Sequence, residues 1–155
     1  MATLTADRPL ETYPTGRNVY DILTTAIIFS GGLVGLSVST GELIRWDNTS
    51  TDDFIGIALA AANGATATPA GTDTTCAVND EGMIIKHIPI ASAAQTSVGL
   101  EVHCTTDNIL VDACLDGGTT SRAVGRIIRF RTAADCDVEI YSATTWHARY
   151  IQSTT

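Results

Sequence analysis

Apolar residues from position 26 onward fall in short runs that are separated by Gly, Asp, Asn, Ser and Thr. Short apolar runs with turn-forming residues at both ends are typical of β-strands, whereas an amphipathic helix repeats its apolar positions every three or four residues. The pattern predicts strands at residues 26–29, 33–38, 43–46, 54–60, 75–78, 83–88, 100–104, 109–112, 124–130 and 138–141.

Glycine occurs in the short connections 30–32, 39–41, 80–82 and 116–118, where tight turns need a positive φ angle. The alanine-rich stretch 58–70 contains glycine and proline, so we expect it to be an irregular loop. These connections favour strands over helices on both sides of them.

Many short strands without long helices between them predict an all-β fold, a small barrel or sandwich, and argue against a βαβ fold. Little helix is expected beyond one short turn at residues 91–95. A chain of 155 residues that is 45% hydrophobic and 17% charged has enough apolar material for a folded core. We therefore expect residues 20–155 to form a single β-rich domain.

Residues 1–19 differ from the rest because they are polar, contain two prolines and follow neither a helical nor a strand period. Proline favours an extended backbone and cannot donate a main-chain hydrogen bond. The segment is predicted to be an extended N-terminal arm that becomes ordered on a partner, with a frayed terminus as the alternative. The arm residues expected to contact the partner are Pro9, Tyr13, Pro14, Val19 and Tyr20.

The chain is acidic, since 9 Lys and Arg residues against 17 Asp and Glu residues give a formal charge of −8, and Lys86 is the only lysine. Nucleic-acid affinity depends on cations that displace counterions from phosphates, so we expect no nucleic-acid partner. The sequence has neither a long apolar run nor the pattern of a signal peptide, so we expect no membrane partner. These features predict synthesis and use on the cytoplasmic side of the cell that makes the protein.

The residues that carry chemistry form no recognisable motif. The three histidines are too far apart for a HxH or HExxH site, and the four cysteines contain no CxxC pair. We expect free, buried cysteines without metal, although one or two disulfides, or a Cys-His dyad brought together by folding, remain open. The residues concerned are His87, His103, His147, Cys76, Cys104, Cys114 and Cys136.

Acidic pairs such as Asp135 with Asp137 could hold a calcium ion, but no complete calcium-binding loop surrounds them and a solvated edge is the favoured interpretation. The glycine pairs lack the sequence context of a phosphate-binding loop. The sequence therefore predicts that the protein is not an enzyme and has no cofactor and no metal site.

One basic run contains Arg122, Arg126, Arg129 and Arg131. On a strand, Arg129 and Arg131 share one face, and Arg126 lies on the opposite face if the strand has no bulge. The run therefore does not build a single stripe for nucleic acid. We interpret Arg126, Arg129 and Arg131 as a patch that meets carboxylates on a partner subunit, with a solvated face as the alternative.

The serial order of short motifs provides a further clue. Residues 27–60 read IIFSGGLVGLSVSTGELIRWDNTSTDDFIGIALA, with a glycine turn before LV, a TG hairpin and the segment FIGIA. Four later blocks follow, which are DEG at 80–82, SVG at 97–99, TDN at 106–108 and AVGRI at 123–127. In this order the blocks resemble the head decoration, or capsid cement, proteins of tailed bacteriophages.

The resemblance implies a structural virion protein, made in the cytoplasm of a bacterial host, that binds the outer face of the phage capsid and stabilises contacts between major capsid proteins. The implied partners are the major capsid protein and further copies of the chain. A homotrimer is expected because capsids offer three-fold sites and because exposed sheet edges favour association. The alternatives are a carbohydrate-binding or other surface adhesion module, which would use Trp46 and Trp146, and a tail or baseplate component.

Overall fold

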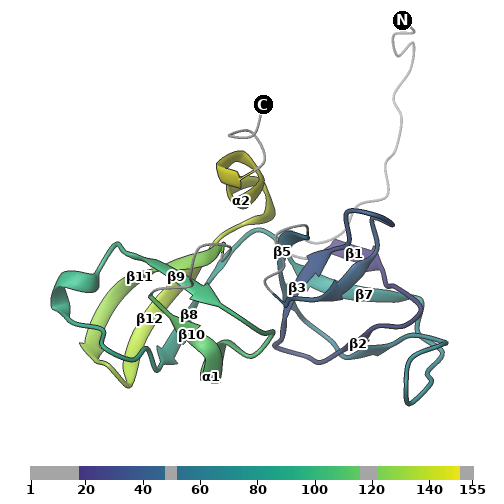
Figure 1. The fold of residues 1–155 in the computed structure, drawn as a ribbon, viewed down its shortest axis with the longest axis horizontal. Coiled ribbons are helices and arrows are strands. Elements are labelled where there is room, and N and C mark those ends of the chain that lie inside the picture. Colours follow the sequence, from purple (N-terminus) through teal and green to yellow (C-terminus); the bar gives the residue numbers. More distant parts are fainter. Residues whose placement is uncertain (1–17, 48–51, 116–121, 151–155) are drawn as a thin grey trace, which may run out of the picture.

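The computed structural model describes residues 18–47, 52–115 and 122–150 of the chain. Strands make up 45% of the structure and helices only 12%, well below the one-third that is typical of globular domains. Figure 1 shows two groups of antiparallel strands along the long axis, with helix α2 above the place where they meet. The prediction of an all-β fold with little helix is confirmed.

The first half of the chain forms a five-stranded antiparallel sheet in the order β1-β7-β5-β3-β4. The edge strands of this sheet meet, because Ile22 and Leu43 form a parallel bridge and the Leu23 N–H donates to the Leu43 carbonyl oxygen over 3.0 Å. The sheet therefore curls around a small core of its own, to which the short pair β2 and β6 adds Ile28 and Ala62. The bounds are β1 (Asn18–Asp21), β2 (Ile27–Ile28), β3 (Leu33–Leu36), β4 (Leu43–Arg45), β5 (Asp53–Ala58), β6 (Ala62–Asn63) and β7 (Thr75–Asn79).

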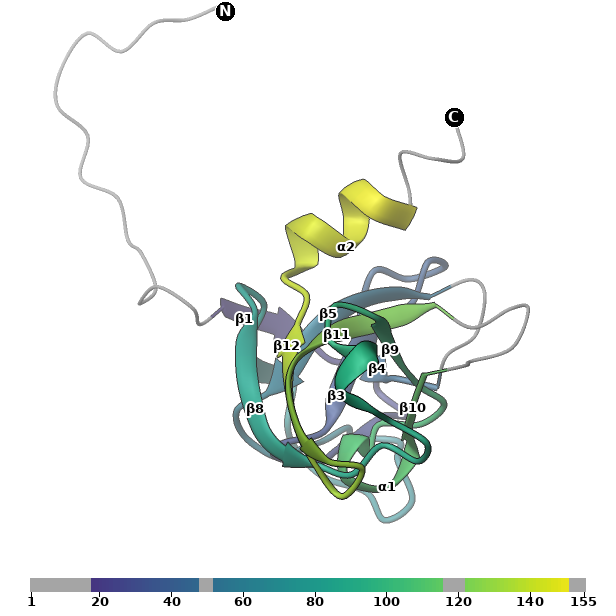
Figure 2. The ribbon, with the colours of Figure 1, turned by 90° about the vertical axis from the view of Figure 1, so that its left-hand side faces the viewer.

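The second half forms another five-stranded antiparallel sheet in the order β10-β9-β11-β12-β8. Its bounds are β8 (Met83–Ile88), β9 (Glu101–Cys104), β10 (Ala113–Cys114), β11 (Ala123–Thr132) and β12 (Asp135–Ile140). One edge of this sheet is the two-residue strand β10, and the other is the six-residue strand β8. Figure 2 looks along the molecule from the side of this second sheet.

Two glycines in the motifs FIGIA and AVGRI stand where neighbouring strands come close. A Cβ atom at Gly56 would lie 2.0 Å from the Asn79 carbonyl oxygen, and one at Gly125 would lie 2.3 Å from the Glu139 carbonyl oxygen. Gly56 also has a φ angle of +156°, which residues with a side chain rarely adopt. A side chain at either position would therefore separate β5 from β7 or β11 from β12.

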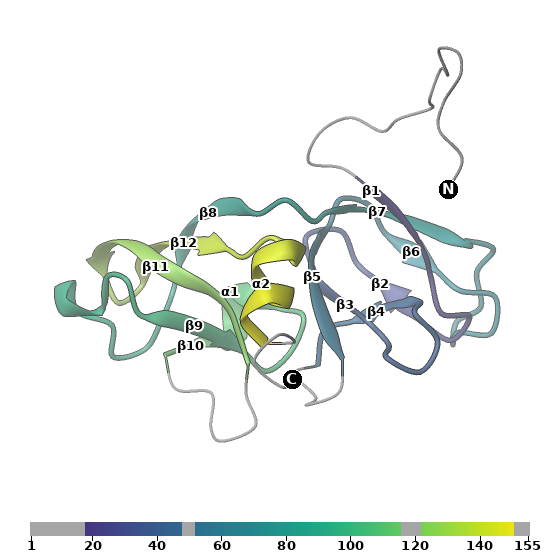
Figure 3. The ribbon, with the colours of Figure 1, turned by 90° about the horizontal axis from the view of Figure 1, so that it is seen from above.

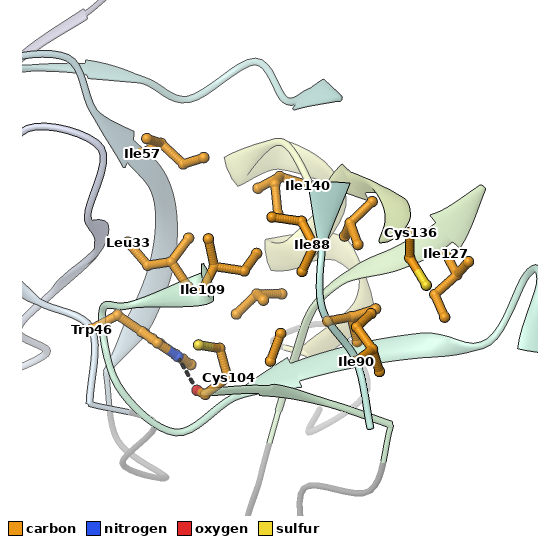
Figure 4. Packing of buried hydrophobic residues seen from close by; sticks show 14 of the residues in the cluster. Leu33, Trp46, Ile57, Ile88, Ile90, Cys104, Ile109, Ile127, Cys136 and Ile140 are labelled. Carbon is orange, nitrogen blue, oxygen red and sulfur yellow. Dashed lines mark hydrogen bonds between the residues drawn. The ribbon is translucent and has the colours of Figure 1, made fainter. Parts of the chain in front are cut away.

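A buried aromatic cluster joins the two sheets. The ring centroid of Trp46 lies 5.4 Å from that of Phe54 on β5 and 6.3 Å from that of Trp146. Both ring pairs have edge-to-face geometry. The Trp46 indole N–H donates to the Cys104 carbonyl oxygen at the end of β9 over 2.9 Å (Figure 4). The Trp146 indole N–H donates to the Ala123 carbonyl oxygen over 3.1 Å. These rings belong to a larger buried hydrophobic cluster, which also includes Leu33, Ile57, Ile88, Ile90, Ile109, Ile127, Cys136 and Ile140.

The strand predicted at residues 109–112 is wrong, because Ile109–Asp112 forms the short helix α1. The Asp112 N–H donates to the Asn108 carbonyl oxygen over 2.9 Å, and only Ile109 of the apolar triplet is buried. Three consecutive apolar residues show no alternation, so their pattern does not separate a strand from a helical turn.

Helix α2 (Ala143–Tyr150) was not expected from the sequence. The segment contains two threonines, which have low helix propensity, and buries only Trp146, so it lacks a repeating apolar face. The Ser142 hydroxyl oxygen accepts the Thr145 N–H over 3.0 Å and caps the first turn. The turn expected at 91–95 is observed slightly later, as the 3₁₀ turn η1 (Gln95–Ser97).

Replacing Trp146 with Ala tests whether α2 is part of the folded core. The change removes a fully buried side chain and the donor to the Ala123 carbonyl, so we expect a loss of about 3–5 kcal/mol in the free energy of unfolding. Guanidinium denaturation followed by circular dichroism measures this loss.

The matched control is His147→Ala, which changes an exposed residue of the same helix. We expect this control to alter the free energy of unfolding by less than about 0.5 kcal/mol. Equal stability of the Trp146→Ala variant and the wild-type protein would show that α2 does not contribute to the core.

Candidate functional site

The first candidate feature is an ion-pair cluster on the hairpin of β11 and β12. The Arg131 guanidinium donates to both carboxylate oxygens of Asp137, over 2.7 and 3.0 Å, and to Asp135 over 3.1 Å. Asp135 is also 2.8 Å from the Nδ1 atom of His87. The carboxylates expected on a partner for Arg131 are therefore supplied by its own hairpin.

The Arg131 hydrogen bond to Asp137, aided by the charge of Arg131, lowers the pKa of this nearly buried carboxyl group. Both members of the acidic pair considered for calcium thus bind Arg131. Within residues 18–47, 52–115 and 122–150, no group of three or more His, Cys, Asp or Glu side chains is placed to hold a metal ion.

Arg126 and Arg129 are both exposed on β11. The β11–β12 pairing has register shifts between Ile127 and Arg129 and again between Phe130 and Thr132, so the simple alternation of faces does not hold along this strand. Arg126 donates to Glu139 over 3.2 Å, which leaves half of its side chain accessible. Arg126 and Arg131 thus pair with different carboxylates of β12.

Arg126 and Glu139 also line a groove of about 650 Å³ beside helix α2, which we call the α2 groove. Its walls include Ile84 on β8, which is 55% exposed, and Thr145 on α2. Tyr141 lies in the groove, and burial raises the pKa of its hydroxyl, which therefore stays protonated. The α2 groove combines an exposed aliphatic side chain with both signs of charge.

A second groove of about 390 Å³, which we call the junction groove, contains residues from both halves of the chain. Arg45 donates to the two carboxylate oxygens of Asp107 over 3.0 and 3.1 Å, and its guanidinium carbon lies 5.4 Å from the Phe29 ring centroid. Phe29 and Leu110 are 55% and 57% exposed in this groove. The Arg45–Asp107 ion pair lines the groove, and the side chains of Phe29 and Leu110 remain accessible to a partner.

The junction groove was not predicted from the sequence. Phe29 ends an apolar run that was predicted to be a strand, and Leu110 belongs to the run that forms α1 instead of a strand. No local signal connects two positions so far apart in the sequence. The glycine turn 30–32 and the turn TDN, which contains Asp107, were both noted in the sequence, but nothing indicated that they lie together.

The structure describes only two of the five arm residues that were expected to contact a partner. Pro9, Tyr13 and Pro14 lie outside the described residues, whereas Val19 and Tyr20 belong to β1 and pair with β7. The Tyr20 hydroxyl donates to the Asp80 carboxylate, and burial with this bond raises its pKa. Tyr20 is therefore held by its own sheet, and Val19 remains 37% exposed.

Cys76, Cys104 and Cys136 are buried and carry free thiols. Burial raises the pKa of all three thiols, that of Cys104 to about 12, so the reactive thiolate form that a Cys-His dyad needs is suppressed. Trp46 and Trp146 are 1% and 0% exposed, so neither ring can stack on a sugar. This burial removes the basis for the predicted carbohydrate platform.

Comparison with known proteins gives no relative: no family model, curated protein or solved structure matches the chain. Among the helices of the described residues, none has the length and apolar character needed to cross a membrane.

Replacing Arg131 with Gln removes the hydrogen bond and charge that hold the pKa of Asp137 below its usual range. A lowered pKa in the folded state stabilises the fold above the ordinary Asp pKa of about 3.9, and this contribution is lost as pH falls through the folded-state value. We expect the variant to be less stable than the wild type at neutral pH, with the difference shrinking in acid. Urea unfolding over a pH series measures this difference.

Arg126→Gln serves as the comparison, because it breaks the more exposed pair with Glu139 and should change stability only slightly at any pH. An Arg131→Gln defect of the same size at neutral and acidic pH would contradict the proposed coupling to Asp137.

Proposed function

We propose that the protein is a head decoration, or cement, protein of a tailed bacteriophage. It binds the outer face of the capsid as a homotrimer and stabilises contacts between major capsid proteins. It acts as a structural part of the virion, by binding alone.

The observation that carries this proposal is the junction groove. Phe29 and Leu110 expose large apolar side chains beside the Arg45–Asp107 pair, which holds the groove in one shape. Exposed apolar side chains around a fixed polar group are typical of protein-binding surfaces. Such a surface suits a permanent protein partner better than a small polar substrate.

The order of the motif blocks supports the same function. FIGIA and AVGRI each place a glycine where two strands come close together. The close approach of the strands explains why an all-β fold needs glycine at these positions of the two blocks. The buried thiols with raised pKa values and the Arg131 carboxylate cluster are engaged in the fold. These features fit a protein that binds and does not catalyse.

Binding can stabilise a capsid through linkage. A ligand that binds the assembled lattice and not its free subunits adds its binding free energy to the stability of the lattice. Several linked copies in one oligomer bind more tightly than a single copy without any new contact. A small acidic protein at many symmetric sites would therefore strengthen the shell from outside.

Two variants test the docking surface. Phe29→Asp and Leu110→Asp each put a charge in the junction groove, and we expect each to weaken capsid binding at least about tenfold, or about 1.4 kcal/mol. The chain is co-expressed with the major capsid protein of the same phage genome, and the amount that sediments with the heads is measured.

Val38→Asp is the matched control, because Val38 is 60% exposed and lies outside both grooves. Its binding should equal that of the wild type, and circular dichroism checks that all three variants fold. Undiminished binding of the Phe29 and Leu110 variants would overturn this docking surface.

The proposed trimer has its own test. The open edge of β8 and the exposed apolar side chains favour self-association, since unpaired strand edges and apolar patches are stabilised when covered. Size-exclusion chromatography with light scattering should give three times the chain mass of 16.3 kDa. A monomer both in solution and on the particle would contradict the trimer.

A further inference from the structure

The direction in which the N-terminal arm leaves the fold is fixed at Asp80. β1 runs antiparallel to β7 with Asn18 opposite Val78, so the N-terminal end of β1 lies near the turn between β7 and β8. The Asn18 amide donates to both carboxylate oxygens of Asp80 over 2.8 Å. Figure 3 shows the start of β1 beside this turn, with β8 continuing along the edge of the second sheet.

The arm cannot simply extend β1 as a longer strand. Successive carbonyl groups of a strand point toward the neighbouring strands on opposite sides. The Ala77 carbonyl oxygen accepts the Leu59 N–H over 2.8 Å and therefore points toward the side of β5. The carbonyls of Val78 and Asp80 therefore face the side of β1. The Asp80 carbonyl already accepts the Ala143 N–H at the start of α2 over 2.8 Å. This carbonyl therefore already has a donor other than a further residue of β1.

The α2 groove begins at the same point. A smaller hollow of about 340 Å³ is lined by Asn18 and Asp80, and it shares Glu81 and Ser142 with the α2 groove. The first described residue of β1, Asn18, therefore lies next to a groove whose lining includes the exposed side chain of Ile84.

The arm carries two arginines and has no net charge. The two arginines and two acidic residues of positions 1–17 cancel, so the formal charge of −8 belongs entirely to the rest of the chain. Asp80, Glu81 and Glu139 line the hollow and the α2 groove and offer carboxylates to a single arginine such as Arg17.

The arm also has apolar side chains at a suitable reach. Tyr13 stands five positions before Asn18, and an extended chain spans about 3.3 Å per residue, so its ring can lie up to about 17 Å from the exit point. Leu10 follows further along the arm, and Ile84 and Tyr141 offer apolar surface inside the groove.

We propose that residues 1–17 dock into the α2 groove of their own chain, with Arg17 at the acidic residues that line it and Tyr13 against Ile84. Attachment at Asn18 gives the arm a high effective concentration at the groove, so no partner is needed for this contact. A neighbouring subunit on a particle would compete with the groove for the same arm. This inference does not depend on the capsid function, because the arm and the groove belong to one chain.

Hydrogen–deuterium exchange of the full-length chain tests the proposal. The arm amides should exchange several-fold more slowly in the wild type than in Ile84→Asp, which puts a charge on the apolar wall of the groove. Val38→Asp, an equally exposed position outside the groove, should keep the protection. Unprotected arm amides in the wild type, or protection that persists in Ile84→Asp, would overturn the proposal.

A cross-linking experiment identifies which chain supplies the arm. Tyr13→benzoylphenylalanine is prepared in nitrogen-15 and unlabelled forms, which are refolded together and irradiated. We expect cross-links from position 13 to the segment 81–84 or 139–145, and only between peptides of the same label. Cross-links between labelled and unlabelled peptides would replace this proposal with arm exchange between copies, and cross-links elsewhere on the chain would overturn the groove.

Discussion

The packing of Trp46 against Phe54 and Trp146 is the contact on which the rest of the structure depends. The first sheet has a core of its own, but its position relative to the second sheet is set where these rings meet. The hydrogen bond from the Trp46 indole to the Cys104 carbonyl also fixes the orientation of the indole ring, because a hydrogen bond requires alignment as well as proximity. The Leu33 N–H, which donates to the Asp107 carbonyl over 2.9 Å, reinforces the same junction.

The scarcity of cations in this acidic chain determines which surfaces can attract a partner. Arg45, Arg126 and Arg131 each pair with a carboxylate of the same chain, and the Arg45–Asp107 pair also connects the two sheets. Charges that are already paired add less to association than free charges would. The exposed apolar side chains of Phe29 and Leu110 in the junction groove and of Ile84 in the α2 groove therefore make shape and burial important sources of affinity there.

The sequence predicted elements whose signal is local, and it missed features that depend on distant residues. The strand expected at 83–88 is β8 with the same bounds, because a short apolar run that follows a glycine turn is enough to specify it. Helix α2 is stabilised mainly by one tryptophan that enters a distant core, which no apolar repeat reveals. The ion pairs of Arg131 were assigned to a partner because the return of Asp137 across the hairpin depends on the pairing of two strands.

The location of the junction groove links partner binding to the packing of the two sheets. Phe29 and Arg45 come from the first half of the chain, whereas Asp107 and Leu110 come from the second half, so the groove exists only while the aromatic cluster holds the sheets together. A partner that binds the groove therefore adds its binding free energy to the stability of that packing. The reverse also holds, because any weakening of the Trp46 contacts lowers the fraction of molecules that can bind and so lowers the apparent affinity.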